Sequence, residues 1–201
     1  MSKLSFPHAS GNSMSIGAPA TNPASDLELK LPATIGTAGE VLQNSTTAGT
    51  LEMGSPFRPA FSAYTSTNYD IASDTWVKAL FQTEHFDSDS AYDTSTSTFT
   101  VPANKGGAYQ VNAAVSVDDI NDGYYVSISL YVDGSVATGF QRLFDWSPAS
   151  GKIVSATFSN VIKLTAGQTV NIYVLQSDSG TQASEDYCNY FSMFRLGGVP
   201  T

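Results

Sequence analysis

Few side chains in this sequence could act as a nucleophile or as its base. The chain has two histidines, His8 and His85, and one cysteine, Cys188. A nucleophilic triad needs a base, most often histidine, held beside a serine or a cysteine. His85 precedes Asp87 and Ser88 in a stretch, residues 85–90, that we expect to be a polar loop, where sequence neighbours seldom hold triad geometry. We therefore expect no nucleophilic hydrolase.

Carboxylates offer a second kind of chemistry. A glycoside hydrolase holds two carboxyl groups roughly 5–9 Å apart in a cleft. The acidic side chains here fall in expected polar loops, where a solvated charge is the ordinary state. We expect the protein not to be an enzyme, and a polysaccharide depolymerase remains the enzymatic alternative. Its candidate carboxylates are Glu84, Asp87, Asp118, Asp119, Asp122, Glu185 and Asp186.

An acidic loop at residues 118–123 could bind a hard cation. Calcium takes several oxygen ligands from carboxylates and amide carbonyls. The loop lacks the residue order of an EF-hand and its closing glutamate, so a turn held by Asp and Asn side chains is the alternative. Beyond calcium we expect no cofactor. The candidate ligands are Asp118, Asp119, Asn121 and Asp122.

Composition excludes several classes of protein. The net charge is −9 and only nine residues are Lys or Arg, which argues against nucleic-acid binding. No run reaches the roughly 20 apolar residues of a membrane span, and no signal core follows Met1. One cysteine allows no intrachain disulfide, which suits assembly in a reducing cytosol. Cys188 lies in a strand-like run, so we expect it to be buried.

The elements that must position these residues are strands. Residues 108–115 place Tyr109, Val111, Ala113 and Val115 on one face, and a period of two indicates a strand with one buried face. No helical pattern is found, so we predict an all-β protein. Other expected strands are residues 75–81, 98–101, 125–130, 136–144, 152–164, 170–175 and 187–196.

Three segments follow one another along the chain. Residues 1–17 are small and polar apart from Phe6 and Pro7, and we predict that they anchor the protein to a larger particle. Residues 18–55 alternate weakly and form an expected β-stem. Pro56 and Pro59 mark the boundary because proline interrupts strand pairing. Residues 56–201 form the expected head.

The stem resembles a module common in tailed-phage fibre proteins. The matching motifs are Leu29-Lys30-Leu31-Pro32, Gly36-Thr37-Ala38-Gly39-Glu40-Val41-Leu42 and Gly49-Thr50-Leu51-Glu52-Met53-Gly54, with Met53 where the module usually has Trp. Such short strands make no core alone, so we predict burial between three copies. An extended linker with fortuitous alternation is the alternative. The expected contacts are Leu27, Leu29, Leu31, Val41, Leu42 and Leu51.

The head resembles the C1q and tumour-necrosis-factor family over about two-thirds of the chain. The ordered motifs are Ala60-Phe61-Ser62-Ala63, Tyr92-Asp93, Phe99-Thr100-Val101-Pro102, Gly107-Ala108-Tyr109, Leu130-Tyr131-Val132-Asp133-Gly134, Ala149-Ser150-Gly151, Leu164-Thr165-Ala166-Gly167-Gln168-Thr169-Val170 and Tyr190-Phe191-Ser192-Met193-Phe194-Arg195-Leu196. The resemblance implies a ten-strand jelly-roll sandwich that assembles as a homotrimer. The aromatic residues that it would place at the trimer contact are Tyr109, Tyr187, Tyr190, Phe191 and Phe194.

Together the two resemblances predict a trimeric fibre or spike protein on the virion of a tailed phage. Its N-terminal segment would contact other virion proteins, and its head would bind a host-surface glycan or protein. A capsid-decorating protein without a receptor role is the alternative, because 201 residues are few for a complete fibre.

Overall fold

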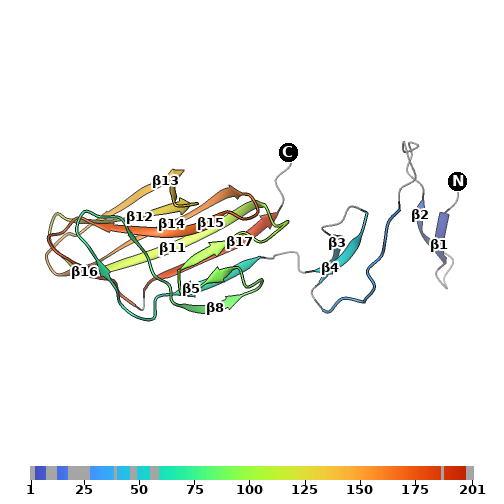
Figure 1. The fold of residues 1–201 in the computed structure, drawn as a ribbon, viewed down its shortest axis with the longest axis horizontal. Helices are drawn as coiled ribbons and strands as arrows, with labels where there is room; N and C mark the ends of the chain where they lie inside the picture. The colour runs from blue at the N-terminus through green and yellow to red at the C-terminus, as the bar shows by residue number, and fades with distance from the viewer. Residues whose placement is uncertain are drawn as a thin grey trace. The chain divides into compact units, whose positions relative to one another are not determined.

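The computed structural model describes residues 3–7, 13–17, 28–38, 40–45, 49–54, 59–186 and 188–197. The chain divides into two compact units, Met1–Ser55 and Pro56–Thr201. The first contains the N-terminal segment and the stem, and the second is the head. The described ranges contain strands and no helix (Figure 1). The prediction of an all-β protein is therefore confirmed.

One sheet of the head contains the longest strands. Its order is β14-β11-β17-β5-β8, and every neighbouring pair is antiparallel. We call it the β17 sheet. Its strands are β14 (Lys152–Leu164), β11 (Gly107–Ile120), β17 (Tyr190–Gly197), β5 (Ala60–Tyr64) and β8 (Thr83–Asp87).

A second sheet packs against the first. Its order is β13-β12-β15-β10-β9, with β7 also paired to β15. The strands are β13 (Ser135–Trp146), β12 (Tyr125–Val132), β15 (Thr169–Gln176), β10 (Thr98–Thr100), β9 (Tyr92–Asp93) and β7 (Val77–Lys78). A short pair, β6 (Asp70–Ile71) and β16 (Gln182–Ala183), completes the head. A five-stranded and a six-stranded sheet therefore form the predicted jelly-roll sandwich, with β7 added to the ten strands of the two sheet paths.

The core lies between the sheets and is rich in aromatic rings. Phe61 stacks on Tyr92 with ring centroids 4.4 Å apart, and on Phe99 at 5.1 Å. Phe191 meets Phe61 edge to face at 4.9 Å. Such geometries are favourable for aromatic pairs and add to the gain from burial. The head therefore has a complete core within one chain.

Alternation predicts most strand positions correctly. Residues 152–164 coincide with β14, and residues 125–130 lie inside β12. Residues 75–81 contribute only the two residues of β7, although Ala79 and Phe81 are buried as a core strand would require. The polar loop predicted at residues 85–90 is wrong at its start, because residues 85–87 belong to β8 and pair with β5.

Gly107 allows the closest approach between two strands of the β17 sheet. Its φ is +153°, and a Cβ there would lie 2.1 Å from the carbonyl oxygen of Gly197. A side chain at Gly107 would therefore clash with the backbone where β11 begins and β17 ends. This requirement explains the glycine of the Gly107-Ala108-Tyr109 motif.

The first unit contains two hairpins, one within residues 1–17 and one in the stem. β1 (Lys3–Pro7) pairs with β2 (Ser13–Gly17), and β3 (Val41–Asn44) pairs with β4 (Leu51–Gly54). Lys30 adds a parallel bridge beside β4: its N–H donates to Gly49 O at 2.8 Å and its carbonyl accepts from Leu51 N at 2.8 Å.

Candidate functional site

The outer face of the β17 sheet carries apolar side chains that are exposed to solvent. Along β17 the residues alternate: Phe191 and Met193 point into the core, whereas Tyr190, Phe194 and Leu196 are 44%, 40% and 55% exposed. Isolated apolar side chains are common on protein surfaces, but a row of them on one strand indicates an interaction surface. This row is the first part of the candidate site.

Two aromatic residues predicted at a trimer contact belong instead to the core of the head. Tyr109 and Phe191 are both fully buried in a single chain. Tyr109 donates its hydroxyl to Lys105 O at 2.5 Å, and burial raises its pKa to about 12. The alternation of β11 and β17 turns these residues inward, so the prediction is wrong for both. Tyr187 lies outside the described residues.

Next to Phe194 the outer face is polar. The Gln110 amide donates to Asn112 Oδ1 at 3.2 Å and to Ser159 Oγ at 2.9 Å. The Ser159 hydroxyl in turn donates to Asn112 Oδ1 at 2.7 Å. Gln110 is the register partner of Phe194. An ordered polar group therefore lies beside the apolar row.

Most of the predicted apolar contacts in the stem are exposed in one chain. Leu29 is 63% exposed, Leu31 72%, Val41 43% and Leu42 52%, while Leu51 is partly buried. Leu27 and the side chains of Phe6 and Pro7 lie outside the described residues. Such a series of exposed aliphatic side chains in so short a segment favours a partner that covers it.

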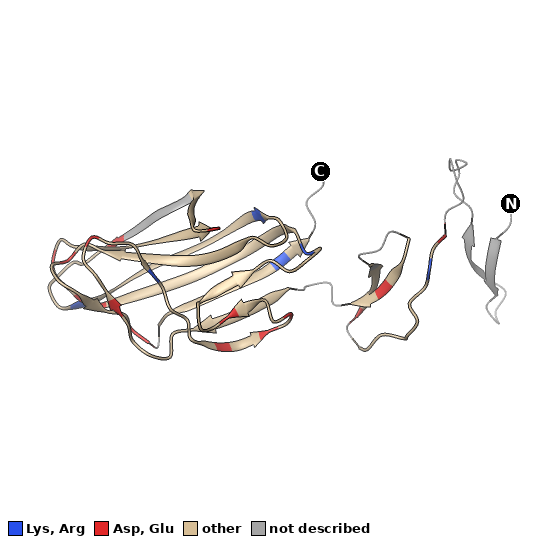
Figure 2. Ribbon diagram, in the orientation of Figure 1, with Lys and Arg blue, Asp and Glu red and all other residues tan. Residues whose placement is uncertain are grey.

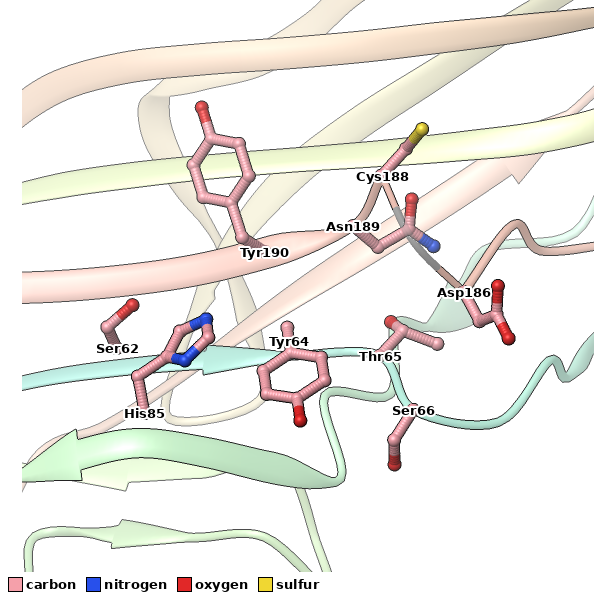
Figure 3. Close-up of a pocket in the computed structure, with 9 residues that line it drawn as sticks. All are labelled: Ser62, Tyr64, Thr65, Ser66, His85, Asp186, Cys188, Asn189 and Tyr190. Carbon is pink, nitrogen blue, oxygen red and sulfur yellow. The ribbon is translucent and has the colours of Figure 1, made fainter.

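A shallow depression of about 790 Å³ opens on the outer face of the β17 sheet, at the Tyr190 end of β17. Figure 3 shows Tyr64, Tyr190, Ser62 and His85 on one side, with Asp186, Cys188 and Asn189 on the other. Tyr190 and Tyr64 are register partners on adjacent strands. Cys188 is exposed here, so its predicted burial is wrong, because it precedes the strand instead of lying in it.

The side chains considered for hydrolysis have other roles. The His85 ring stacks on Tyr64 with centroids 4.6 Å apart. The Ser88 hydroxyl donates to Asp89 Oδ2 at 2.5 Å and accepts from Ala60 N at 2.9 Å. Asp87 accepts from Tyr92 N at 2.7 Å. These contacts hold β8 and its turn in place.

The acidic loop at residues 118–123 is organised by hydrogen bonds. Asn121 donates from its backbone and side-chain nitrogens to Asp178 Oδ2, at 2.6 and 3.0 Å, and Asp178 is fully buried. Asp118 Oδ1 accepts from Asp119 N, and Asp122 N donates to Ser150 Oγ. Across the described ranges no three His, Cys, Asp or Glu side chains gather as a metal site. The predicted calcium ligands Asp118, Asp119, Asn121 and Asp122 therefore do not form such a site.

Among the described residues of the head, few are Lys or Arg, so little positive charge is available to bind phosphate. Figure 2 shows Lys and Arg as isolated positions along the described strands. Among the residues described, no helix is long and apolar enough to cross a membrane. The surface instead offers an apolar row and a partly aromatic depression.

No family model matches the chain, and no curated protein sequence matches it. Solved structures do match. The globular domain of zebrafish complement 1qA is 16% identical, with 71% of this chain and all of that chain covered and a TM-score of 0.50. The Eiger TNF of S. frugiperda is 17% identical, with 73% and 96% covered and a TM-score of 0.50.

The head is a C1q/TNF-like jelly roll. The two matches, the two packed antiparallel sheets and the ordered motifs agree on this fold. At such low identity the C1q/TNF-like fold is what the comparisons establish. The likeness of residues 18–55 to phage-fibre stems stays a prediction from the sequence.

Proposed function

We propose that the chain is a trimeric fibre or spike protein on the virion of a tailed phage. Residues 1–17 dock on other virion proteins, the stem wraps around two further copies, and the C1q/TNF-like head binds a ligand on the host surface. The proposal joins the fibre-like motifs of the stem to the fold of the head.

The observation that carries the proposal is the exposed apolar surface of the stem. Leu31 is 72% exposed and Ile35 is 98% exposed in a single chain. Full burial of one leucine side chain contributes roughly 1.5–3 kcal/mol. Three copies that share an axis would bury several such side chains each, which is the usual remedy for a segment too small to form its own core.

The head supports the same assembly. Phe194 and Leu196 lie near the end of β17, and Phe194 is the register partner of Ala60 at the beginning of β5. Contact between heads at Phe194 and Leu196 would add to the contact between stems. The polar side chains of Gln110, Asn112 and Ser159, which bond to one another within one chain, would border this contact.

Antibody labelling of intact particles tests the virion role. We expect antibodies against the purified head to label the distal tail of the phage that encodes the chain, and purified protein to slow adsorption of that phage to its host. Label spread over the capsid, with unchanged adsorption, would favour the capsid-decorating alternative. Particles without label would contradict both. Sugar released from host capsule by the purified protein would point to the depolymerase alternative.

A further inference from the structure

We infer that the depression at the Tyr190 end of β17 binds a neutral sugar ring. The inference rests on the proposed function, because it names the chemical class of the host-surface ligand. Two features carry it: tyrosine residues at paired positions of adjacent strands, and a buried amide donor that has no partner among the described residues.

The aromatic part of the site is held rigidly. Tyr64 and Tyr190 are cross-strand neighbours on the outer face, and the His85 ring stacks on Tyr64 at an interplanar angle of 26°. Tyr190 is 44% exposed, so its ring is open to a ligand. The C–H faces of a pyranose are apolar and pack on such rings, whereas its hydroxyl groups need polar partners.

Asn189 supplies one such partner. The residue is 2% exposed, and its Oδ1 accepts from Ser116 N at 2.6 Å. That bond fixes the orientation of the amide, and Nδ2 has no hydrogen-bond partner among the described residues. A buried donor without an acceptor is costly and rare in folded proteins. A hydroxyl oxygen of a ligand in the depression would satisfy it after a small opening of the site.

The remaining lining selects an uncharged ligand. The Asp186 carboxylate can accept hydrogen bonds from sugar hydroxyls and repels anions. None of the described residues that line the depression is Lys or Arg, which an acidic sugar would require. A quaternary ammonium would suit the tyrosine rings but offers Asn189 no acceptor. The volume of about 790 Å³ falls within the ordinary range for small-ligand sites.

A second copy of the chain is the competing occupant. The sequence predicts Tyr190 at a trimer contact together with Phe194. The two residues lie at opposite parts of β17, however: Tyr190 pairs with Tyr64 at the end of β5, and Phe194 with Ala60 at its beginning. Contact between copies at Phe194 therefore leaves the Tyr190 end as a separate site.

Binding of simple sugars to the full chain tests the inference. The probes are the methyl glycosides of glucose, galactose and N-acetylglucosamine, followed by ligand-observed NMR and calorimetry at millimolar concentrations. Tyr190→Ala removes a ring and Asp186→Ala removes an acceptor, both at surface positions. Tyr124→Ala, another exposed tyrosine outside the depression, is the matched control. The native mass of each variant is measured in parallel.

The expected result is saturable binding of one of these glycosides. Affinity should fall about tenfold or more in Tyr190→Ala and Asp186→Ala, remain unchanged in Tyr124→Ala, and the mass should not change. Absence of saturable binding in the wild type, or binding that survives both substitutions, overturns the inference. Dissociation of the assembly by Tyr190→Ala, without sugar binding in the wild type, assigns the depression to a second copy. Failure of the proposed function is distinguishable from this outcome. It would appear in the antibody experiment as particles without label, whether or not the protein binds sugar.

Discussion

The head and the stem use similar alternating sequences but reach opposite burial. In the head, Phe61 and Phe99 are at most 1% exposed, because a second sheet of the same chain covers them. In the stem, Leu31 and Ile35 remain 72% and 98% exposed. A period of two therefore specifies which residues share a face, while the number of strands in one chain decides whether that face is covered.

The stem is held locally by contacts other than a core. Thr37 N donates to Glu40 Oε2 at 2.7 Å, and Gln43 Nε2 donates to Glu52 Oε1 at 3.1 Å. A Cβ on Gly36 would lie 2.7 Å from Met53 Cε, so the glycine lets Met53 pack on the turn. These contacts shape the segment without covering its aliphatic side chains.

The largest effect is expected in the core of the head. Phe61→Ala removes a ring that contacts Tyr92, Phe99 and Phe191, and should lower the free energy of unfolding by about 3–5 kcal/mol. Urea denaturation, monitored by tryptophan fluorescence, measures this free energy of unfolding. Phe86→Ala, at an exposed position of β8, should change it by less than about 0.5 kcal/mol. Equal losses of stability in Phe61→Ala and Phe86→Ala would contradict the conclusion that one position is covered by the second sheet and the other is not.

The next effect concerns assembly. The double substitution Leu29→Ser and Leu31→Ser should weaken the trimer by about a hundredfold or more, on the order of 1.5–3 kcal/mol per leucine, and leave the thermal unfolding of the head unchanged. Analytical ultracentrifugation over a dilution series measures the first and calorimetry the second. A trimer of undiminished strength would show that the stem leucines stay exposed in the assembly.

Phe194→Ala should weaken the trimer by a smaller amount, because the stem contacts remain. The ring is 40% exposed in one chain, and we expect a loss of roughly 1 kcal/mol per subunit, measured by the same dilution series. Unchanged unfolding of the head at high dilution is the control. If the substitution only destabilises the head, Phe194 belongs to the core and the apolar row is not a contact.

An alkaline test concerns the buried side of the same sheet. Burial raises the pKa of Tyr109 to about 12, above the roughly 10 of an unfolded tyrosine. Its contribution is therefore fully present below about pH 10 and declines as pH rises toward 12. Tyr109→Phe, which loses the bond to Lys105 O, should be about 1 kcal/mol less stable at neutral pH, and the difference should shrink between about pH 10 and 12. A constant difference would show that the pKa of Tyr109 is the same in the folded and unfolded states, contrary to the rise caused by burial.

The smallest effect is expected at an exposed turn. Asp133 accepts from Thr169 N at 2.8 Å and from Gln168 Nε2 at 3.0 Å, and these bonds, the first above all, lower its pKa. A lowered pKa contributes stability above the unfolded value of about 3.9, and this is lost as pH falls. The stability difference between wild type and Asp133→Asn should therefore narrow in acid. A difference that widens in acid would contradict this assignment.

The sequence predicts the fold well because alternation is local. The faces of β11 and β12 follow directly from residues such as Val111 and Ile128, both buried. Alternation cannot tell which side of a strand meets its own second sheet. The resemblance to the C1q and tumour-necrosis-factor family supplies a side for Phe191, the assembly contact, and this prediction is wrong because Phe191 lies in the core. The sequence predicts a loop at residues 85–87 because the polar residues of an edge strand have a pattern similar to that of a turn.

The candidate site was less predictable. The depression brings Tyr64 together with Asn189 and Tyr190, which lie more than a hundred positions away in the sequence. No motif marks Asn189, and its unpaired nitrogen becomes visible only once Ser116 N is seen to occupy its oxygen. The exposed leucines of the stem, in contrast, were predictable, because too few apolar residues surround them to build a core.

The native mass of the purified full-length chain tests the account most directly. We predict a mass three times that of the 21.3 kDa chain by native mass spectrometry, with the monomer appearing only on strong dilution or after substitution of the stem leucines. A stable monomer at micromolar concentration would contradict the account, because the exposed apolar residues of the stem and of β17 would then need no partner.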